Sequence, residues 1–328
     1  MKLVSIVIPT LNEEKTLEPA VESILSGNYP IDYLEIFIVD GLSTDRTPAI
    51  IINLTKKYKQ IKYIINPGAN KSNAINLASE QATGFYFMRA DAHAIYHKNY
   101  IKEAVQSLDI DKNVISVGGI RKATSRSNSL FSRTFEFVFQ TRIGVGNANY
   151  NLEINSSKYV TILFLFFMRT SDFKKIGKFD TRLTRGQDRE YNLRIINSGG
   201  LLLLNPKMKS LYYCRDSFFK FILWAFVGGK TPFYISKITK TNLISIRNYL
   251  PVLMIIYFIC TFSLISYSSK FLIMILPFIV YFYPSVTLPI KSFLQRLFLP
   301  VILFSYHFSY GIGSLFGIFS TLNNDDCQ

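Results

Sequence analysis

The last third of the sequence is apolar and contains no acidic side chain. From residue 217 to residue 324 there is no Asp or Glu, whereas both occur throughout the preceding part. Three apolar segments lie in this stretch, at about 250–267, 271–290 and 297–322. Because a helix of about 20 apolar residues can cross the hydrocarbon core of a bilayer, the sequence predicts a globular domain over residues 1–216 followed by three transmembrane helices. Buried helices of a large soluble core are the alternative interpretation.

The basic residues near these segments predict how they are oriented. They precede the first segment and separate the second from the third (Lys237, Lys240, Arg247, Lys291 and Arg296). Since Lys and Arg are enriched in cytoplasmic loops, we expect a multi-pass protein of the inner cell membrane whose first 216 residues are cytoplasmic. Residues 217–247 mix aromatic and basic side chains, which is typical of an amphipathic helix lying among lipid headgroups.

Charge and cysteine content exclude several classes of protein. The formal charge of +15 could indicate nucleic-acid binding, but the basic residues form no DNA- or RNA-binding motif. We therefore expect membrane lipids and phosphate-bearing substrates as partners, and no nucleic acid. The cysteines Cys214, Cys260 and Cys327 form no CxxC pair, which argues against a zinc site and a disulfide framework. The apolar run at residues 3–8 is too short for a secretion signal.

Short apolar runs alternate with helical patterns over the first 90 residues. Strands are expected at 3–8, 34–39, 61–65 and 85–89, with helices at 14–25, 47–58 and 71–83. This alternation predicts a doubly wound, mostly parallel α/β sheet. Ligands bind such sheets beyond the carboxyl ends of the strands, so we expect the loops after Ile8, Val39, Ile65 and Met88 to form the site.

The rest of the globular part is less regular. Further strands are expected at 114–119 and 160–168, and a helix at 188–197. Residues 120–158 combine Ser, Asn, Arg and Gly with scattered Phe, and this composition predicts a mobile loop over the site.

Polar side chains follow the first two predicted strands and could read a nucleobase and its ribose. They are Pro9, Thr10, Asn12 and Glu13 after the first strand, and Asp40 and Ser43 after the second. A carboxylate directly after a buried strand needs a partner, which favours a ligand role for Asp40. Asp45 and Thr47 are better explained as capping residues of the next helix. The sequence contains neither GxGxxG nor GxxxxGK[ST], which argues against a dinucleotide or P-loop site.

The next two loops suit a diphosphate and a metal ion. Lys71 opens the third helix, where backbone N–H groups favour anions, although a solvated surface lysine is equally consistent. Asp91 follows the fourth strand and suits an oxygen-ligated Mg²⁺ or Mn²⁺ that also holds substrate phosphates, with His93 as a second ligand for Mn²⁺. His93 and His97 also have zinc-like spacing, but no third zinc ligand is evident.

Asp188 lies in the first turn of the predicted helix at 188–197. The helix dipole stabilises a carboxylate there, so Asp188 can act as a general base. A plain helix cap is the alternative interpretation.

In this order, these motifs resemble the family 2 glycosyltransferases of the GT-A fold, over most of residues 3–230. The stretches RADAH at 89–93, GQDREYNLR at 186–194, YCR at 213–215 and HFSYGIG at 307–313 are similar to the succinoglycan-biosynthesis branch. Members of that branch extend a polyprenyl-diphosphate-linked oligosaccharide at the membrane.

The resemblance implies a role for each matched position. Thr10, Glu13 and Asp40 would contact the nucleoside of a nucleotide-sugar donor. The other residues expected to bind the nucleotide-sugar are Pro9, Asn12, Ser43 and Arg89. Lys71 would contact its diphosphate, Asp91 would hold the metal, and Asp188 would deprotonate the acceptor. Gln187, Arg194 and Arg215 would lie on the acceptor side.

This chain departs from the family at two positions. A DxD motif is replaced by Arg89-Ala90-Asp91 or Asp91-Ala92-His93, so metal binding depends mainly on Asp91, and Gln187 replaces the usual Glu. The QxxRW motif of processive synthases is absent, which favours transfer of one sugar at a time.

The predicted function is inverting transfer of a sugar to a hydroxyl of a polyprenyl-diphosphate-linked glycan, in exopolysaccharide or capsule biosynthesis. A polyprenyl-phosphate sugar synthase is the alternative enzyme, and a non-catalytic membrane scaffold of polysaccharide assembly is the remote one.

Overall fold

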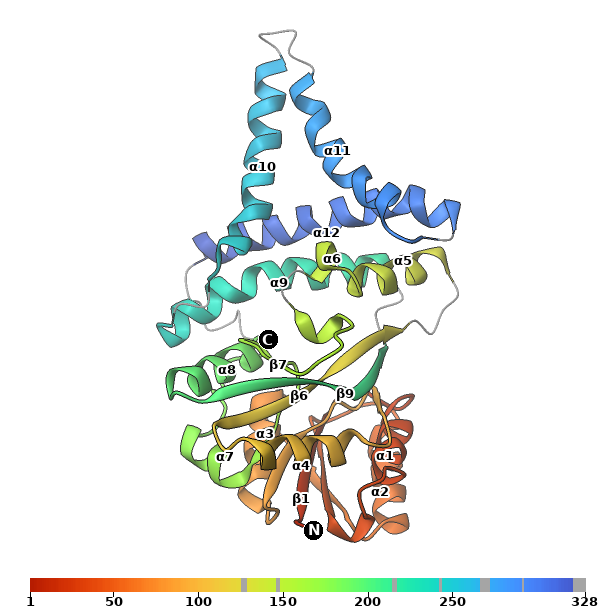
Figure 1. Cartoon of the computed structure of the whole chain (residues 1–328), viewed down its shortest axis with the longest axis vertical. Coiled ribbons are helices and arrows are strands. Elements are labelled where there is room, and N and C mark those ends of the chain that lie inside the picture. Colours follow the sequence, from red (N-terminus) through yellow and green to blue (C-terminus); the bar gives the residue numbers. More distant parts are fainter. Residues whose placement is uncertain are drawn as a thin grey trace. The chain divides into compact units, whose positions relative to one another are not determined.

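The computed structural model describes residues 1–124, 129–145, 148–213, 217–241, 244–265, 272–290 and 292–320. The chain forms two compact units, shown in Figure 1. The first contains residues 1–123 and the described residues from 148 to 213, and the second contains residues 129–145 and the described residues from 217 onward.

Nine strands of the described chain form one mixed sheet in the first unit. Its order is β3-β2-β1-β4-β8-β6-β9-β5, with β7 beside β9. The strands are β1 Val4–Thr10, β2 Leu34–Asp40, β3 Ile61–Ile65, β4 Tyr86–Arg89, β5 Ala94–Tyr96, β6 Val114–Thr124, β7 Lys158–Tyr159, β8 Phe167–Arg169 and β9 Leu201–Tyr213. The neighbours among β3, β2, β1 and β4 are parallel. β8 is antiparallel to both β4 and β6, and β9 is antiparallel to β5 and β7.

The four parallel strands lie where the sequence predicts them, but the expectation of a mostly parallel sheet is wrong for the other half. The strand expected at 160–168 is reduced to the three residues of β8, and the short β7 lies just before the expected range. The longest strand, β9, was not expected, because Asn205, Pro206 and Lys207 interrupt its apolar pattern. The fold is therefore an α/β fold with a mixed sheet.

Helices cover both faces of this sheet, as a doubly wound fold requires. α1 (Leu17–Leu25), α2 (Thr47–Lys57) and α4 (Tyr100–Ile110) contribute to one apolar cluster, and α3 (Lys71–Gln81), α7 (Thr170–Ile176) and α8 (Gln187–Asn197) contribute to the other. The alternation of side chains along a strand separates the two clusters. In β1, Ile6 and Ile8 belong to the first cluster and Val7 to the second.

The order of the parallel strands creates a switch point between β1 and β4. From β1 the chain adds β2 and β3 on one side and then returns to place β4 on the other. A crevice opens at such a reversal, outside the carboxyl ends of the strands. Pro9 lies inside β1 although it has no N–H to donate. Its nitrogen lies on the β4 side of the strand, and the pairing with β4 ends before Pro9, with the bond from the Ala90 N–H to Val7 O.

The described helices of the second unit are α5 (Leu130–Phe139), α6 (Arg142–Val145), α9 (Phe218–Thr239), α10 (Ile246–Ile265), α11 (Leu272–Thr287) and α12 (Phe293–Phe319). The expectation of a loop over residues 120–158 is therefore wrong in part, because α5 and α6 lie there. The apolar side chains of α5 account for its helicity: Phe135 stacks on Phe221 of α9 with 4.3 Å between ring centroids, and a period of three to four residues buries one helix face.

Small residues bring α9 and α12 close together. A Cβ on Gly313 would lie 1.9 Å from the carbonyl oxygen of Phe226, and a Cβ on Gly229 would lie 2.0 Å from that of Tyr310. Such contact between backbones is typical of helix packing through small residues. Lys237 Nζ then donates to three carbonyl oxygens at the end of α12, each at 2.8 Å, where the helix dipole favours a cation.

Length and composition identify one helix that could cross a membrane. Among the described residues α12 alone meets the test, and Asn248–Thr261 of α10 is a shorter apolar stretch. Helices α10, α11 and α12 begin and end within a few residues of the three predicted segments. Three spans, the limit near residue 216 and the interfacial role of 217–247 stay predictions.

A buried carboxylate ties the amino ends of the parallel strands together. Glu35 of β2 accepts hydrogen bonds from Ser5 Oγ at 2.6 Å, Lys62 Nζ at 2.8 Å and the Thr83 N–H at 3.1 Å. Burial raises the pKa of Glu35, but the bonds from Lys62, Ser5 and Thr83 outweigh it, so that its pKa lies below the ordinary value.

We expect Glu35→Gln to lower the free energy of unfolding by about 1–3 kcal/mol at pH 7, since the donors lose a charged acceptor. A carboxylate with a lowered pKa stabilises the fold above its unfolded pKa of about 4.3, and this contribution is lost as pH falls through the folded pKa. The gap between wild type and variant should therefore shrink below about pH 4. Urea unfolding of the detergent-solubilised chain, at pH 7 and below about pH 4, measures this difference in the free energy of unfolding. Glu80→Gln, which removes an exposed partner of Lys178, is the control, and a gap that does not change with pH would contradict the assignment.

Candidate active site

The loops that follow β1 and β2 are bonded to each other at the carboxyl edge of the sheet. Asn12, in the left-handed region at φ 54°, donates its N–H to Ser43 Oγ at 2.8 Å and accepts from the Thr44 N–H at 2.8 Å. The Ser43 hydroxyl donates to Asp40 at 2.5 Å, and the Tyr63 hydroxyl donates to the other oxygen at 3.2 Å. The buried Asp40 carboxylate thus has a fixed position at the end of β2.

Further hydrogen bonds hold other residues of these two loops. The Thr10 hydroxyl donates to Ile8 O at 3.0 Å, and the Glu13 N–H donates to Thr47 Oγ1 at 2.9 Å. Asp45 accepts from the Thr47 N–H at 2.9 Å. Asp45 therefore supports the first residue of α2, whose N-cap is Arg46, whereas the Thr47 hydroxyl links α2 to the loop after β1.

Glu13 and His93 meet across the switch point. Glu13 Oε1 lies 2.7 Å from His93 Nδ1, and Glu13 Oε2 accepts from the Thr16 hydroxyl at 2.5 Å. Burial raises the pKa of Glu13, but the hydrogen bond and charge of His93 outweigh it and leave the pKa below its ordinary value. With its proton on Nδ1, the imidazole keeps Nε2 free to accept or to ligate, and Nε2 lies 3.8 Å from Asp91 Oδ2.

Arg89 is the centre of the site. This last residue of β4 is fully buried, its Nη2 donates to Asp91 Oδ1 at 2.9 Å, and its Nη1 contacts Asp188 Oδ1. Arg89 thus holds two carboxylates from distant parts of the chain. It offers no exposed surface to a ligand, which differs from its expected place among the nucleotide contacts.

Burial and charge act in opposite directions on the three groups. Burial lowers the pKa of Arg89, but Asp188 and Asp91 outweigh it and keep the pKa above its ordinary value. Burial raises the pKa of Asp91, but Lys71 and Arg89 hold the pKa well below its usual range. For Asp188 burial dominates: its pKa is raised, although Arg89 and Lys71 act against this. The surrounding cations therefore favour the anionic form of Asp91, whereas burial favours protonation of Asp188.

The helix that carries Asp188 begins beside this cluster. Gly186, at φ 73°, has the left-handed conformation that lets the chain turn into α8. Asp188 is the second residue of the helix, and its side chain is 23% exposed. It can therefore reach a ligand while Arg89 holds one of its oxygens.

Lys71 completes the charges at the site. It opens α3, whose cap is Asn70, and Asn70 accepts from the Asn73 N–H at 2.7 Å. Lys71 Nζ lies 3.8 Å from Asp91 Oδ1 with 40% of its side chain exposed. A half-exposed cation beside a helix N-terminus is suited to an anionic ligand.

Asp91 and His93 fit a divalent cation. Asp91 Oδ2 is buried and has no hydrogen-bond partner among the described residues, although a buried polar atom normally has one. His93 Nε2 is nearby, and the carboxylate of Glu13 on Nδ1 is the usual support of a metal-bound histidine. The described residues contain no group of three or more His, Cys, Asp or Glu that could hold a metal. Mg²⁺ or Mn²⁺ bound here would take its other ligands from water and substrate phosphates.

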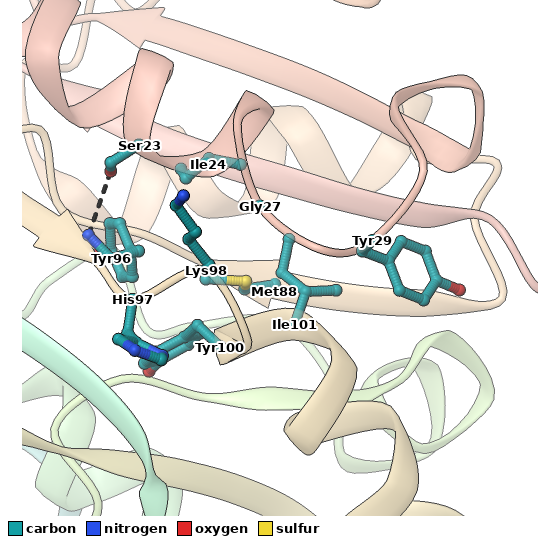
Figure 2. A pocket seen from close by; sticks show the side chains of 10 residues that line it. All are labelled: Ser23, Ile24, Gly27, Tyr29, Met88, Tyr96, His97, Lys98, Tyr100 and Ile101. Atoms are coloured by element: carbon teal, nitrogen blue, oxygen red, sulfur yellow. Dashed lines mark hydrogen bonds between the residues drawn. The ribbon is translucent and has the colours of Figure 1, made fainter.

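A pocket behind the Asp91 loop contains no candidate site residue. Figure 2 shows its lining, which includes Ser23, Tyr96 and His97. Ser23 Oγ accepts from the Tyr96 N–H at 3.0 Å (Figure 2). The Tyr96 hydroxyl in turn accepts from the Asp91 N–H at 2.7 Å. Tyr96 therefore supports the Asp91 loop from behind. The sequence gives no sign of this, because a tyrosine in a strand reads as an ordinary core residue.

The residues expected on the acceptor side are only partly placed. Gln187 is buried at the start of α8. Arg194 is 2.7 Å from Glu190 and donates to Ile176 O at 3.1 Å. Arg215 lies outside the described residues. An acceptor role for these three stays a prediction.

The chain is similar to known glycosyltransferases. The family model for glycosyl transferase family 2 matches residues 5–177, more than half of the chain. A Methanococcus voltae protein named dolichyl N-acetyl-alpha-D-glucosaminyl phosphate 3-beta-D-2,3-diacetamido-2,3-dideoxy-beta-D-glucuronosyltransferase is 29% identical over 95% of this chain and 96% of its own length. Succinoglycan biosynthesis protein ExoA of Rhizobium meliloti is 25% identical over 68% of this chain and 66% of its own length.

A solved structure shows the same fold. The mannosyltransferase of Pyrobaculum calidifontis, in complex with GDP-Man and Mn²⁺, superposes with a TM-score of 0.66 at 16% identity, over 96% of this chain and 87% of that chain.

We expect Arg89→Met to destabilise the protein strongly, because it removes the guanidinium that pairs with the buried Asp91 and the partly buried Asp188. Loss of one partner of a buried ion pair costs about 3–5 kcal/mol. Arg182→Met, which removes a 63% exposed partner of Asp180, should change the free energy of unfolding by about 0–1 kcal/mol. Urea unfolding at pH 7 compares the two variants, and losses of equal size would show that Arg89 is not what neutralises the cluster.

Proposed function

This chain belongs to glycosyl transferase family 2, and from that premise we propose that it transfers one sugar, with inversion, from a nucleoside diphosphate sugar to a hydroxyl of a polyprenyl-diphosphate-linked glycan. It is a glycosyltransferase. The proposal includes anchoring in the inner cell membrane by the apolar helices, with the catalytic unit on the cytoplasmic side. It also includes a role in exopolysaccharide or capsule biosynthesis.

The donor occupies the carboxyl edge of the parallel strands. Asp40 and Thr10, at the ends of adjacent strands, face the nucleoside, and Pro9, Asn12, Glu13 and Ser43 shape the same loops. Lys71 neutralises the diphosphate. Asp91 and His93 would hold Mg²⁺ or Mn²⁺, which when bound supplies positive charge to the departing nucleoside diphosphate.

Asp188 acts as the general base. Its carboxylate takes the proton of the acceptor hydroxyl while the oxygen forms its bond to the anomeric carbon from the opposite face. The bond from that carbon to the diphosphate oxygen breaks, and the electron pair leaves with the nucleoside diphosphate. The observation that carries this assignment is the buried Arg89, which contacts both Asp91 and the partly exposed Asp188.

The acceptor is inferred from the relatives. The name of the Methanococcus voltae relative refers to a sugar on a dolichyl phosphate carrier, and that of the Rhizobium meliloti relative refers to succinoglycan biosynthesis. A lipid-linked acceptor is also consistent with the apolar helix α12.

The first test is an assay of purified membranes with a panel of UDP- and GDP-sugars and polyprenyl-diphosphate-linked acceptors. One donor should support transfer, and chelation of divalent cations should abolish it, since Asp91 and His93 supply at most part of a coordination shell. Transfer unaffected by chelation would contradict the metal assignment. If no donor is hydrolysed and none supports transfer, the proposed function is wrong.

We expect Asp188→Asn to lower transfer by about 10²- to 10⁴-fold, the usual contribution of a general base, while nucleotide binding is kept. Asp172→Asn is the matched control: Asp172 is 20% exposed and pairs with Arg169, as Asp188 is 23% exposed and pairs with Arg89. Single-turnover kinetics and nucleotide titration measure the two effects. Near-wild-type transfer by Asp188→Asn would refute the base, and would favour a lipid phosphate as acceptor, which needs no base.

A further inference from the structure

Arg121 has an environment that the proposed mechanism does not use. Its guanidinium carbon lies 3.9 Å from the ring centroid of Phe164, 4.3 Å from that of Tyr212 and 5.2 Å from that of Tyr150. Its Nε donates to Asn151 Oδ1 at 2.6 Å. Three aromatic rings and one amide therefore fix the orientation of this cation.

The neighbours of Arg121 leave the edge with its two terminal nitrogens available. Phe164 and Tyr212 lie within 4.3 Å of the guanidinium carbon, and Asn151 accepts the hydrogen bond from Nε. Among the described residues, neither terminal nitrogen of Arg121 has a hydrogen-bond or ion-pair partner. A guanidinium presents two parallel N–H groups along that edge, a geometry that matches the two oxygens of a phosphate or carboxylate. Because its rotamers are already restricted, Arg121 loses little conformational entropy when it binds such an anion.

The topology places Arg121 at the same sheet edge as the active site. β8 is antiparallel to β4, and β6 is antiparallel to β8, so β6 runs in the same direction as β4. Arg121 lies near the carboxyl end of β6. Two aromatic rings connect it to the site: Phe164 is also 5.7 Å from the guanidinium of Arg89, and Tyr212 packs edge-on against His93 at 5.3 Å.

Arg121 and Lys71 lie on opposite sides of the cluster. Asp40 and Lys71, which serve the donor, belong to β2 and α3, on the β1 side of β4. Arg121 lies two strands away on the other side, since the order continues from β4 to β8 and β6. A donor diphosphate held by Lys71, with the divalent cation that Asp91 would carry, therefore leaves Arg121 to a second anion.

We propose that Arg121, with Phe164 and Tyr212 as its platform, binds the phosphate group of the acceptor. This inference rests on the proposed function, which supplies the acceptor class. An acceptor held by its phosphate at Arg121 and approached by Asp188 at its hydroxyl is fixed at two points. The distance between those points selects which hydroxyl reacts, so Arg121 determines acceptor specificity.

The test compares an acceptor that carries a diphosphate, farnesyl-diphosphate-linked N-acetylglucosamine, with one that carries no anion, octyl N-acetylglucosaminide, and each variant is compared with the wild type on the same acceptor. Arg121→Gln should raise the KM for the diphosphate acceptor about 10- to 100-fold, the value of charge-assisted hydrogen bonds, and leave the KM for the octyl acceptor and for the donor unchanged. Arg121→Lys, which keeps the charge without the two-point edge, should give an intermediate KM. Lys122→Gln is the matched control, because Lys122 is the next residue of β6 and is exposed.

Three results would overturn the proposal. An equal loss with both acceptors would show that Arg121 only supports the fold. A rise confined to the donor KM would assign the anion to the donor, and an unchanged KM for the diphosphate acceptor would show that Arg121 binds no anion.

A second measurement separates failure of this proposal from failure of the proposed function. If the wild type hydrolyses its donor but transfers to neither acceptor, the farnesyl diphosphate compound should still inhibit hydrolysis in the wild type and in Lys122→Gln, and at least 10-fold less in Arg121→Gln. Equal inhibition of all three would overturn the assignment of Arg121.

Discussion

The fold of the catalytic unit has to satisfy one buried guanidinium. Arg89 has no exposed surface, and a buried charge is tolerated only when it is paired. Its partners, Asp91 and Asp188, belong to the loop after β4 and to α8. The requirement to neutralise Arg89 therefore brings Asp188, the candidate base, to an arginine 99 residues earlier in the sequence. The same arginine holds Asp91, the candidate metal ligand. In this chain, the ion pairs at the end of β4 therefore also bring the candidate site residues together.

The strand order determines where this centre can open to a ligand. Because β4 returns beside β1, the loops after these strands face each other, and Glu13 meets His93 there. Behind the loop, Tyr96 holds the backbone of Asp91. Asp40, Glu13 and Asp91 are thus each held by a group from another element. Such support keeps polar groups in place without rearrangement during the reaction.

The second unit obeys a different constraint. Its helices pack through glycines and aromatic rings, as Gly229, Gly313 and Phe135 illustrate, and they leave many apolar side chains exposed. In water such a surface is unfavourable, whereas a bilayer accepts it. The apolar composition and the proposed lipid-linked acceptor are both consistent with the proposal that the first unit works next to a membrane.

The sequence by itself determined the parallel strands, the edge that carries the site, and Asp40, Lys71, Asp91 and Asp188 as its candidate residues, because alternation of apolar residues and polar strand ends are local patterns. It placed Arg89 among the nucleotide contacts and missed β9, the antiparallel half of the sheet and the surroundings of Arg121. These features depend on pairs of residues far apart in the chain, such as Arg89 with Asp188 and Arg121 with Tyr212. Periodicity carries no information about such pairs, since burial and charge pairing are decided only when the strands and helices pack.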